Sequence, residues 1–546
     1  MSTAPTLSAR VLRKAEHGAE SPPTAGSVRL SAIQAFGLPL LFTLALAAFA
    51  LLGSVRQNPR LLWSFLGASA VLFAWNAALA GSALSKGRSL ALEIVLRKQH
   101  YLQACAQGSV LLYWGWHWRQ VYDSAHLIAA QLLFAYAFDM LLSWSRRDTY
   151  TLGFGPFPVI FSINLFLWFR PDWFYLQFLM VAIGFAAKEL IRWDKEGRRA
   201  HIFNPSSFPL ALFSVGLLLT GTSDITWGRE IANTQFYPPH IYLMLFLVGL
   251  PGQYLFGVTT MTMSAVLATY LFGLIYFAVT GIYFFFDSYI PIAVFLGMHL
   301  LFTDPSTSPR TELGRMIFGV LYGLSTVLLY QLLGSAGMPT FYDKLLQVPI
   351  LNLSIKLIDS AARSKALRAL DPAAIGRWLA PHQRNLAYMS IWAMVFAVMS
   401  GAQGVGDSHP GQWLPFWREA CNDDRPYACQ YLADVESSFC SRGSGWACNE
   451  SGILQAELGF DRADVVTEIE RGCELGFRTA CANVDRLIAG LATFESSPPT
   501  LEDYPIILRG SKGAIAERSP ADLLARACTQ ASVSYTHLTL PTTPYV

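Results

Sequence analysis

Two polar turns stand at the ends of apolar runs and carry side chains that could bind a ligand. Asn204 lies in "HIFNPSSF" and Asp304 in "LLFTDPSTSPR", each directly before a proline. A residue before proline is biased away from helix, so the Asn204 side chain could cap the helix that follows. Held at a helix N-terminus, the same group could instead bind an anion or a polar ring. Asp304 could pair with Arg310 or Arg315, cap a helix, or accept hydrogen bonds from a cofactor.

A third group of polar residues follows an interrupted apolar stretch, "VGLPGQYLFGVTTMTMSAV". Pro251 and Gly257 predict a broken helix, and three threonines, Thr259, Thr260 and Thr262, follow. Broken helices inside membranes are tolerated where they line a cavity or pack on protein. The stretch could therefore line an ion or cofactor site, or it could be a kinked helix only.

Two histidines, His126 and His299, fall within apolar runs. A pair of intramembrane histidines could ligate a haem. The alternative is that each is a polar group satisfied by neighbouring helices, and that interpretation is favoured because the spacing shows no ligand pattern.

Cysteine is concentrated at the C-terminal end, where seven of the eight lie beyond residue 420. Cys421 and Cys429, Cys440 and Cys448, and Cys473 and Cys481 each lie eight residues apart. Zinc sites favour two to four residues between ligands, so this spacing does not predict zinc. Across a short turn it can join two antiparallel helices, and disulfides need an oxidising compartment. We therefore predict disulfides Cys421–Cys429, Cys440–Cys448 and Cys473–Cys481.

The composition shows which elements must position these residues. Of 546 residues, 53% are hydrophobic and 14% charged, and the net charge is +3. A soluble protein carries about 25% charged residues, so an ordinary soluble enzyme is excluded, and nothing predicts a nucleic-acid partner. About 20 apolar residues cross a bilayer as a helix. We predict an all-α polytopic membrane protein of 11 to 13 spans, near 31–53, 61–82, 104–118, 125–145, 154–169, 173–192, 206–222, 241–258, 261–285, 288–303, 316–336, 341–358 and 386–404.

Lysine and arginine concentrate in alternate loops, notably 86–98, 188–199 and 356–384. Cytoplasmic loops carry such an excess. The pattern predicts a cytoplasmic N-terminus, residues beyond about 405 outside, and a bacterial-type inner membrane. The predicted disulfides point to the same side for the C-terminal region.

Residues about 150–360 resemble a family of membrane subunits that the sodium-translocating NADH:quinone reductase and the Rnf electron-transport complex share. The resemblance rests, in order, on "KELIRWDKEGRRAHIFNPSSF", "LVGLPGQYLFGVTT", "HLLFTDPSTSPRTELGRMIFGVLYG" and "MPTFYDKLLQVPILNLSIKLID". It implies a membrane subunit that passes electrons through FMN or riboflavin, coupled to movement of Na⁺ or H⁺, with other subunits as partners. Carried across, it makes Asn204 and Asp304 the candidate flavin-binding residues.

The loop 221–240, "GTSDITWGREIANTQFYPPH", departs from that family. The family's usual Ser-Gly-Ala-Thr motif, whose threonine holds FMN covalently, has no counterpart in this loop. Thr234 is the nearest candidate, and the residues around it do not match that motif. Covalent FMN is therefore not predicted. The departure leaves open a second function, a flavin-free scaffold or permease-like protein.

The sequence around the cysteines repeats, as "FWREACNDDRPYACQYL", "SSFCSRGSGWACNES" and "IERGCELGFRTACANV". It resembles the cysteine-rich Sel-one-like repeats of the Hcp kind, which are TPR-like helix pairs with one disulfide each. The resemblance implies an α-solenoid that binds a protein partner outside the cytoplasm. Cys528 looks like half of a fourth pair, whereas the tail at 533–546 looks like a translated sequencing adapter.

These observations divide the chain into successive segments. We expect a cytoplasmic tail at 1–30, a membrane extension at 31–149, an electron-transfer module at 150–358, a basic amphipathic linker at 359–385, a last span at 386–404 and repeats at 415–532. The sequence does not identify the ion, the electron donor or the acceptor.

Overall fold

The computed structural model describes residues 27–507 except 196, 237, 286–287, 403–404, 406–408, 413 and 492. Cys528 and the tail at 533–546 lie outside the described residues. The described chain is mostly helical, with five short strands. Within it, six helices are long and apolar enough to cross a membrane, and they are Ala32–Leu51, Pro59–Ser85, Ala125–Arg146, Pro171–Leu190, Thr259–Thr280 and Glu312–Ser335.

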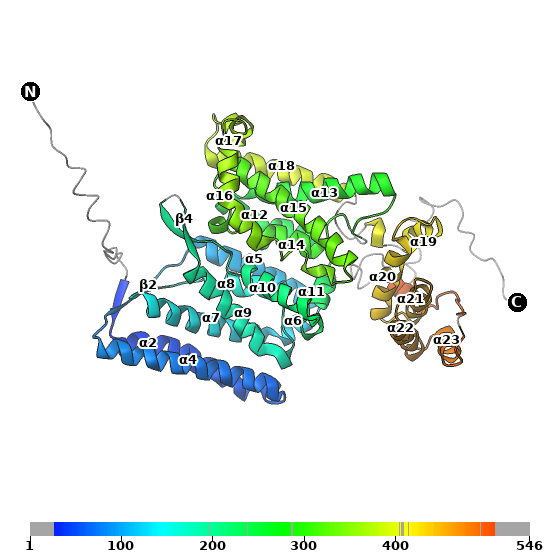
Figure 1. Cartoon of the computed structure of the whole chain (residues 1–546), viewed down its shortest axis with the longest axis horizontal. Coiled ribbons are helices and arrows are strands. Elements are labelled where there is room, and N and C mark those ends of the chain that lie inside the picture. Colours follow the sequence, from blue (N-terminus) through cyan, green and yellow to red (C-terminus); the bar gives the residue numbers. More distant parts are fainter. Residues whose placement is uncertain are drawn as a thin grey trace, which may run out of the picture.

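The chain begins with an apolar helical hairpin that packs on the rest of the helical body. Helices α2 (Ala32–Ala48) and α4 (Pro59–Ser85) pack against each other, and both contact α7 (Ala125–Arg146). Strand β1 (Ser27–Leu30) pairs antiparallel with β2 (Leu90–Ile94), which pairs parallel with β3 (Thr149–Leu152). The hairpin forms one edge of the body in Figure 1.

Ten helices form two units with the same order of elements. Unit one consists of α5 (Lys98–His117), α7, α8 (Pro156–Asn164), α9 (Phe174–Leu190) and α10 (Ser207–Thr220). Unit two consists of α12 (Ile241–Phe256), α13 (Thr259–Thr280), α14 (Ile292–Leu300), α15 (Glu312–Ser335) and α16 (Val348–Ala362). The expected segment boundary at residue 150 falls inside unit one.

The packing inside the two units corresponds element by element. In unit one α8 packs on α5 and α7, and α9 packs on α7 and α10. In unit two α14 packs on α12 and α13, and α15 packs on α13 and α16. The equivalent helices α5 and α12 contact each other, as do α10 and α16. Tyr113, near the end of α5, donates to the carbonyl of Pro239, just before α12 begins, so these two helices run antiparallel. The units are thus inverted copies of one arrangement.

Two faces of the helical body differ in charge. The face that we call the basic face carries β2, β3 and the hairpin of β4 (Arg192–Lys195) and β5 (Arg198–His201). Ion pairs hold it together: Arg88 with Asp148 at 2.5 Å, Arg192 with Glu189 at 2.6 Å, and Arg384 with Glu312 at 2.7 Å. The opposite face carries the short elements η3 (Ser223–Ile225) and α11 (Gly228–Thr234).

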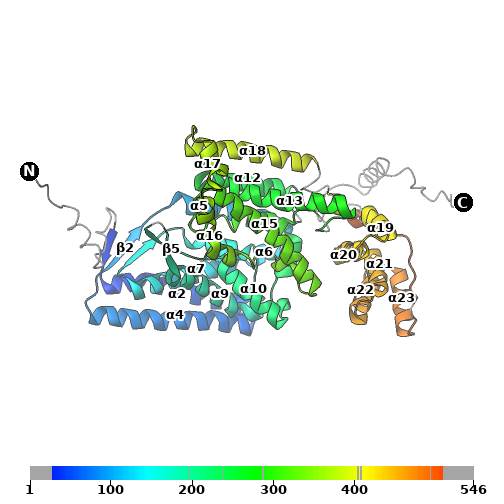
Figure 2. The same ribbon diagram turned by 45° about the horizontal axis from the view of Figure 1, so that its top comes forward.

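Short connecting elements complete the body. They are η1 (Phe49–Leu51), α3 (Gly53–Arg56), α6 (Gln120–Asp123), η2 (Pro171–Trp173), η4 (Pro305–Thr307), η5 (Thr340–Tyr342), η6 (Arg368–Leu370) and α17 (Pro372–Ile375). Helix α18 (Pro381–Gly401) then runs along α12 and α13. It begins at the basic face, where Arg384 meets Glu312, and leads toward the C-terminal domain (Figure 2).

The C-terminal domain is a separate stack of helices with its own core. After η7 (Pro410–Gln412) come α19 (Leu414–Asn422), α20 (Ala428–Ser441), α21 (Gly445–Glu457), α22 (Arg462–Glu474), α23 (Arg478–Ile488) and α24 (Tyr504–Ile507). Its core includes Ile282 and Tyr283 from the loop after α13. Arg425 donates to the carbonyl of Gly281 at 2.8 Å. The domain therefore sits at the far end of α13, away from β2 and β4 (Figure 1).

All three predicted disulfides are confirmed, and each joins consecutive helices. Cys421–Cys429 links α19 to α20, Cys440–Cys448 links α20 to α21, and Cys473–Cys481 links α22 to α23. The Cα atoms of each pair lie 4.5 to 4.6 Å apart. The eight-residue spacing places both cysteines beside a short turn between antiparallel helices.

Two expected spans contain short helices instead. The apolar stretches 154–169 and 288–303 hold α8 and α14, each nine residues long. Helix α8 ends at Asn164 and the chain continues as buried irregular backbone through Phe169. Helix α14 begins after Pro291 and ends before the turn at Asp304. Both are half-helices that end inside the body.

Candidate functional site

Asn204 sits where the predicted cap was placed, and its hydrogen bonds are made within the protein. Its side-chain oxygen accepts from the Ser206 amide at 2.9 Å, the Ser206 hydroxyl at 2.8 Å and the Ser207 amide at 3.1 Å. Its side-chain nitrogen donates to the carbonyl of Leu301 at 3.0 Å. The residue is 5% exposed. Asn204 thus caps α10 and ties it to the end of α14, which leaves its oxygen no room for a ligand.

Asp304 is a second cap in a neighbouring loop on the basic face. Its carboxylate accepts from the Ser306 amide at 2.9 Å and the Thr307 hydroxyl at 3.3 Å, and it meets His201 Nε2 at 3.4 Å. Burial alone would raise the pKa of Asp304. The hydrogen bond and charge of His201, together with the bonds from Ser306 and Thr307, have the larger effect and hold this pKa below its usual value. Asp304 is a stable carboxylate at neutral pH.

Of the possibilities raised for Asp304, the structure shows the cap, whereas Arg310 and Arg315 bond to other groups. The backbone amide of Arg310 donates to Asp359 at 3.0 Å, and Arg315 donates to the carbonyls of Pro309 and Gly257. The reason is that α16 carries Asp359 under the loop, where its carboxylate also accepts from the amide and hydroxyl of Thr311. The sequence analysis missed Asp359, although a lone acid in the apolar "SIKLID" was a usable signal.

The apolar stretch breaks at Gly257 and not at Pro251. Helix α12 continues through Pro251 to Phe256 and ends at Gly257, whose φ of 62° suits glycine. Thr259, Thr260 and Thr262 are buried in α13, and the Thr259 hydroxyl donates to Asn385 at 3.0 Å. These threonines pack helices together.

A buried amide cluster lies at the inner end of α8. Gln131 on α7 donates to Asn164 at 3.1 Å, Asn164 donates back at 2.9 Å, and Gln177 on α9 donates to Gln131 at 3.0 Å. All three are at most 1% exposed. A cavity of about 320 Å³ reaches this cluster and is lined by polar groups that include Asn58, Asp123 and His126. The sequence analysis missed the cluster, although single amides in apolar runs mark functional positions in membranes.

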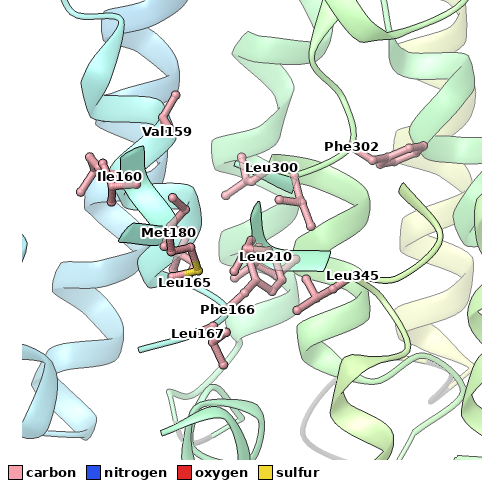
Figure 3. Packing of buried hydrophobic residues seen from close by; sticks show 14 of the residues in the cluster. Val159, Ile160, Leu165, Phe166, Leu167, Met180, Leu210, Leu300, Phe302 and Leu345 are labelled. Carbon is pink, nitrogen blue, oxygen red and sulfur yellow. The ribbon is translucent and has the colours of Figure 1, made fainter. Parts of the chain in front are cut away.

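Both half-helices point their C-terminal ends into the body. The carbonyl of Leu165, after α8, accepts from Gln235 at 2.5 Å, and that of Leu300, in α14, accepts from Gln107 at 3.3 Å. Between them, the apolar side chains of Phe166, Leu210 and Leu345 gather (Figure 3). A helix C-terminus carries partial negative charge, and the Gln235 and Gln107 side chains donate to that end of each half-helix.

Unit two holds a polar pair near the basic face. His299 on α14 bonds through Nδ1 to the carbonyl of Phe295 at 2.8 Å, and its ring is buried. A Cβ on Gly249 would lie 3.0 Å from the His299 ring and 3.6 Å from the Gln253 amide, so these side chains are neighbours. Within the described residues, His299 Nε2 and both polar side-chain atoms of Gln253 find no hydrogen-bond partner. His126, by contrast, lines the cavity of unit one and contacts Ser54 at 3.4 Å.

A buried ion pair lies between α15 and α16. Lys344 Nζ is 3.4 Å from Asp343, and the residues are 5% and 2% exposed. Tyr322 on α15 donates to the carbonyl of Lys344 at 3.1 Å. Lys344 lies in the interior, where Asp343 compensates its charge.

Thr234, the nearest candidate for covalent FMN, is 6% exposed and accepts a hydrogen bond from Trp114 at 3.1 Å. The residues proposed for flavin thus use their polar groups within the protein and do not fit an isoalloxazine ring. Comparison with known proteins adds nothing, since no family model, curated protein or solved structure matches the chain.

Proposed function

We propose that this chain is a multi-pass membrane subunit of an electron-transport complex, and that its two inverted units form a route for a small cation. The observation that carries the proposal is the pair of half-helices. Helix α8 starts beside β3 on the basic face, α14 starts on the opposite face, and both end inside. Inverted repeats with discontinuous helices are typical of membrane transport folds, and their half-helix ends bind ions.

The outward surface supports placement in a bilayer. Large apolar side chains on the six long helices and on α10 point away from the body, among them Trp63, Val71, Leu219, Ile275 and Val279, each at least 65% exposed. Such a surface suits lipid. Counting α8 and α14 with the irregular backbone beside them as one passage each, we propose thirteen passages.

Charge and disulfides together suggest the orientation. The basic face would lie in the cytoplasm, and the disulfide-linked domain, at the other end of α13, would lie outside, where disulfides persist. An odd number of passages agrees with this, since the described part of the chain begins at β1 on the basic face and α18 leads to the C-terminal domain. A bacterial-type inner membrane provides both compartments.

Cation flux, measured both for the purified chain alone and with NADH and partner subunits, tests the cation route. Proteoliposomes loaded with a Na⁺- or pH-sensitive dye should show cation uptake in at least one of these conditions, and that uptake should fall at least tenfold in Asn164→Leu. The matched control is Asn76→Leu, because Asn76 is a buried amide on α4, outside both units. Equal flux in both variants would contradict the route, as would anion uptake in place of cation uptake.

The electron-transport role rests on the order of motifs between residues 150 and 360. We propose FMN or riboflavin as the cofactor, bound away from Asn204 and Asp304, whose oxygens are taken. Purified protein should show flavin absorbance that acid precipitation releases into the supernatant, because Thr234, the nearest candidate for a covalent link, is buried and hydrogen-bonded to Trp114. A colourless preparation from cells grown with riboflavin would contradict this part alone.

The second candidate is a flavin-free permease or scaffold. Its specific support is that Asn204, Asp304 and Thr234 all serve the fold. A permease differs from the redox subunit in one measurable way, because its cation flux would proceed without an electron donor. Flux that requires NADH and partner subunits supports the redox subunit, whereas flux in their absence supports the permease.

A further inference from the structure

An extended segment of this chain lies across the helices of the C-terminal domain. After α23, residues 493–500 have no regular secondary structure and run past α21 and α23. Asn483 on α23 accepts from the Glu495 amide at 2.8 Å and donates to the Glu495 carbonyl at 2.7 Å. Asn449 on α21 donates to the same carbonyl at 3.1 Å. Two fully buried asparagines thus hold one residue of the segment through its main chain.

Further contacts extend this recognition along the main chain. Arg486 donates to the carbonyl of Thr493 at 3.2 Å, and Trp446 Nε1 donates to the carbonyl of Ser497 at 3.0 Å. The three positions are 493, 495 and 497, so alternate residues are held, as in an added strand. Main-chain contacts of this kind accept many sequences and give affinity.

Two side-chain contacts supply selectivity. Arg486 forms an ion pair with the Glu495 carboxylate. The Thr479 and Ser497 hydroxyls lie 2.5 Å apart, which leaves space for a small residue only. The groove formed by Trp446, Asn449, Thr479, Asn483 and Arg486 therefore fits an extended segment with an acid two residues before a small hydroxyl residue.

Hydrogen bonds and one apolar contact hold the segment. Thr493, Glu495 and Ser496 are exposed, the Ser496 hydroxyl donates to Glu450 at 2.7 Å, and Phe494 is half-buried against the core of the domain. The loop has two fixed ends, α23 and Asp503, which is buried and accepts from Ser444 at 2.7 Å and from the Trp446 amide at 3.2 Å. When the segment leaves the groove, hydrogen bonds to an incoming peptide would replace those that it gives up.

We propose that this groove is a recognition site for an extended, acidic, serine-containing segment of another protein, and that residues 493–497 occupy it until that segment displaces them. The inference concerns the C-terminal domain and does not depend on transport or flavin. The partner is a polypeptide with an exposed acid-x-serine pattern on the same side of the membrane as this domain.

Binding of a labelled peptide to the full chain tests the proposal. The probe is a fluorescein-labelled peptide with the sequence of residues 491–501, added to the protein in detergent without reductant. Glu495→Pro removes the amide that donates to Asn483 and the carboxylate that Arg486 holds, while every groove residue stays. We expect the peptide to bind this variant at least tenfold more tightly than the unmodified chain.

Matched variants then test whether the groove residues bind the peptide. Arg486→Ala, added to Glu495→Pro, should weaken peptide binding at least tenfold, whereas Arg478→Ala, an exposed arginine on the same helix, should leave it unchanged. A peptide with lysine in place of the glutamate should bind at least tenfold more weakly. Equal binding to Glu495→Pro and the unmodified chain, or no effect of Arg486→Ala, would overturn the proposal.

Hydrogen exchange on the unmodified chain keeps the test independent of whether the variants fold. The Glu495 amide should exchange at least a hundredfold faster than amides within α21 and α23, since the segment opens while the helices stay folded. Exchange of all these amides at one rate would show that the segment is a fixed part of the domain and would overturn the proposal.

Discussion

Gln131 and Asn164 exchange two hydrogen bonds, at 3.1 and 2.9 Å, across the contact between α7 and α8. The Asn164 side chain also donates to the carbonyl of Ile160 at 2.7 Å. This pairing ties the end of α8 to α7, and it lies where the cavity of unit one reaches the interior of the body.

The pairing predicts strong coupling between the two residues. Gln131→Leu or Asn164→Leu alone should lower the free energy of unfolding by about 1–3 kcal/mol, because each leaves a buried amide unpaired. The double variant should lose less than the sum of the two. Thermal unfolding of all four proteins in detergent gives the coupling, and simple additivity would show that the amides do not depend on each other.

Glycines at two positions of α15, Gly319 and Gly323, permit its close contact with α13. A Cβ on Gly319 would lie 2.2 Å from the carbonyl oxygen of Met261, and one on Gly323 would lie 2.6 Å from that of Ala265. We expect Gly319→Ala to destabilise the protein by about 1–3 kcal/mol through overpacking. Gly216→Ala on α10 is the control, because its Cβ would meet nothing within 4 Å. A neutral Gly319→Ala would contradict the close packing.

The apolar runs and the cysteine spacing were enough to predict a helical protein and its disulfides, because both are local patterns. The ends of the half-helices were not predictable in the same way. The residues after Asn164 are apolar through Phe169, and the carbonyls at the end of α8 accept from the Trp168 indole and from Gln235, which lies 70 positions after Leu165. The partner of Asp304 is similarly remote, since His201 reaches it from β5. Long-range contacts of this kind leave no signal in neighbouring residues.

Burial of Glu436 makes the stability of the C-terminal domain depend on pH. Burial raises the pKa of Glu436 to about 8; Arg418, 3.4 Å away, opposes this and Glu450 adds to it. The folded domain therefore binds a proton that the unfolded chain releases at a lower pH. The part of the domain's stability that this proton contributes is fully present below the usual pKa of a glutamate. It falls as pH rises toward 8, by at most about 1.4 kcal/mol per pH unit.

Chemical denaturation of the chain between pH 5 and 8 measures this slope for the domain. Glu436→Gln should remove most of it, because glutamine stays neutral throughout. Glu457→Gln, an exposed residue of α21, should keep it. A slope that survives in Glu436→Gln would assign the effect to another group.

The buried pair of Asp343 and Lys344 gives the last prediction. Removing one partner of a buried ion pair costs about 3–5 kcal/mol, because the remaining charge is uncompensated. We expect Lys344→Met to reduce thermal stability sharply and Asp343→Asn/Lys344→Met to recover most of the loss. Lys356→Met is the control, since Lys356 lies on the outside of α16 over the Trp193 ring. If the double variant is as stable as the parent but loses cation flux, the ion pair serves transport. If it keeps both its stability and its cation flux, neither the fold nor the cation route needs the two charges.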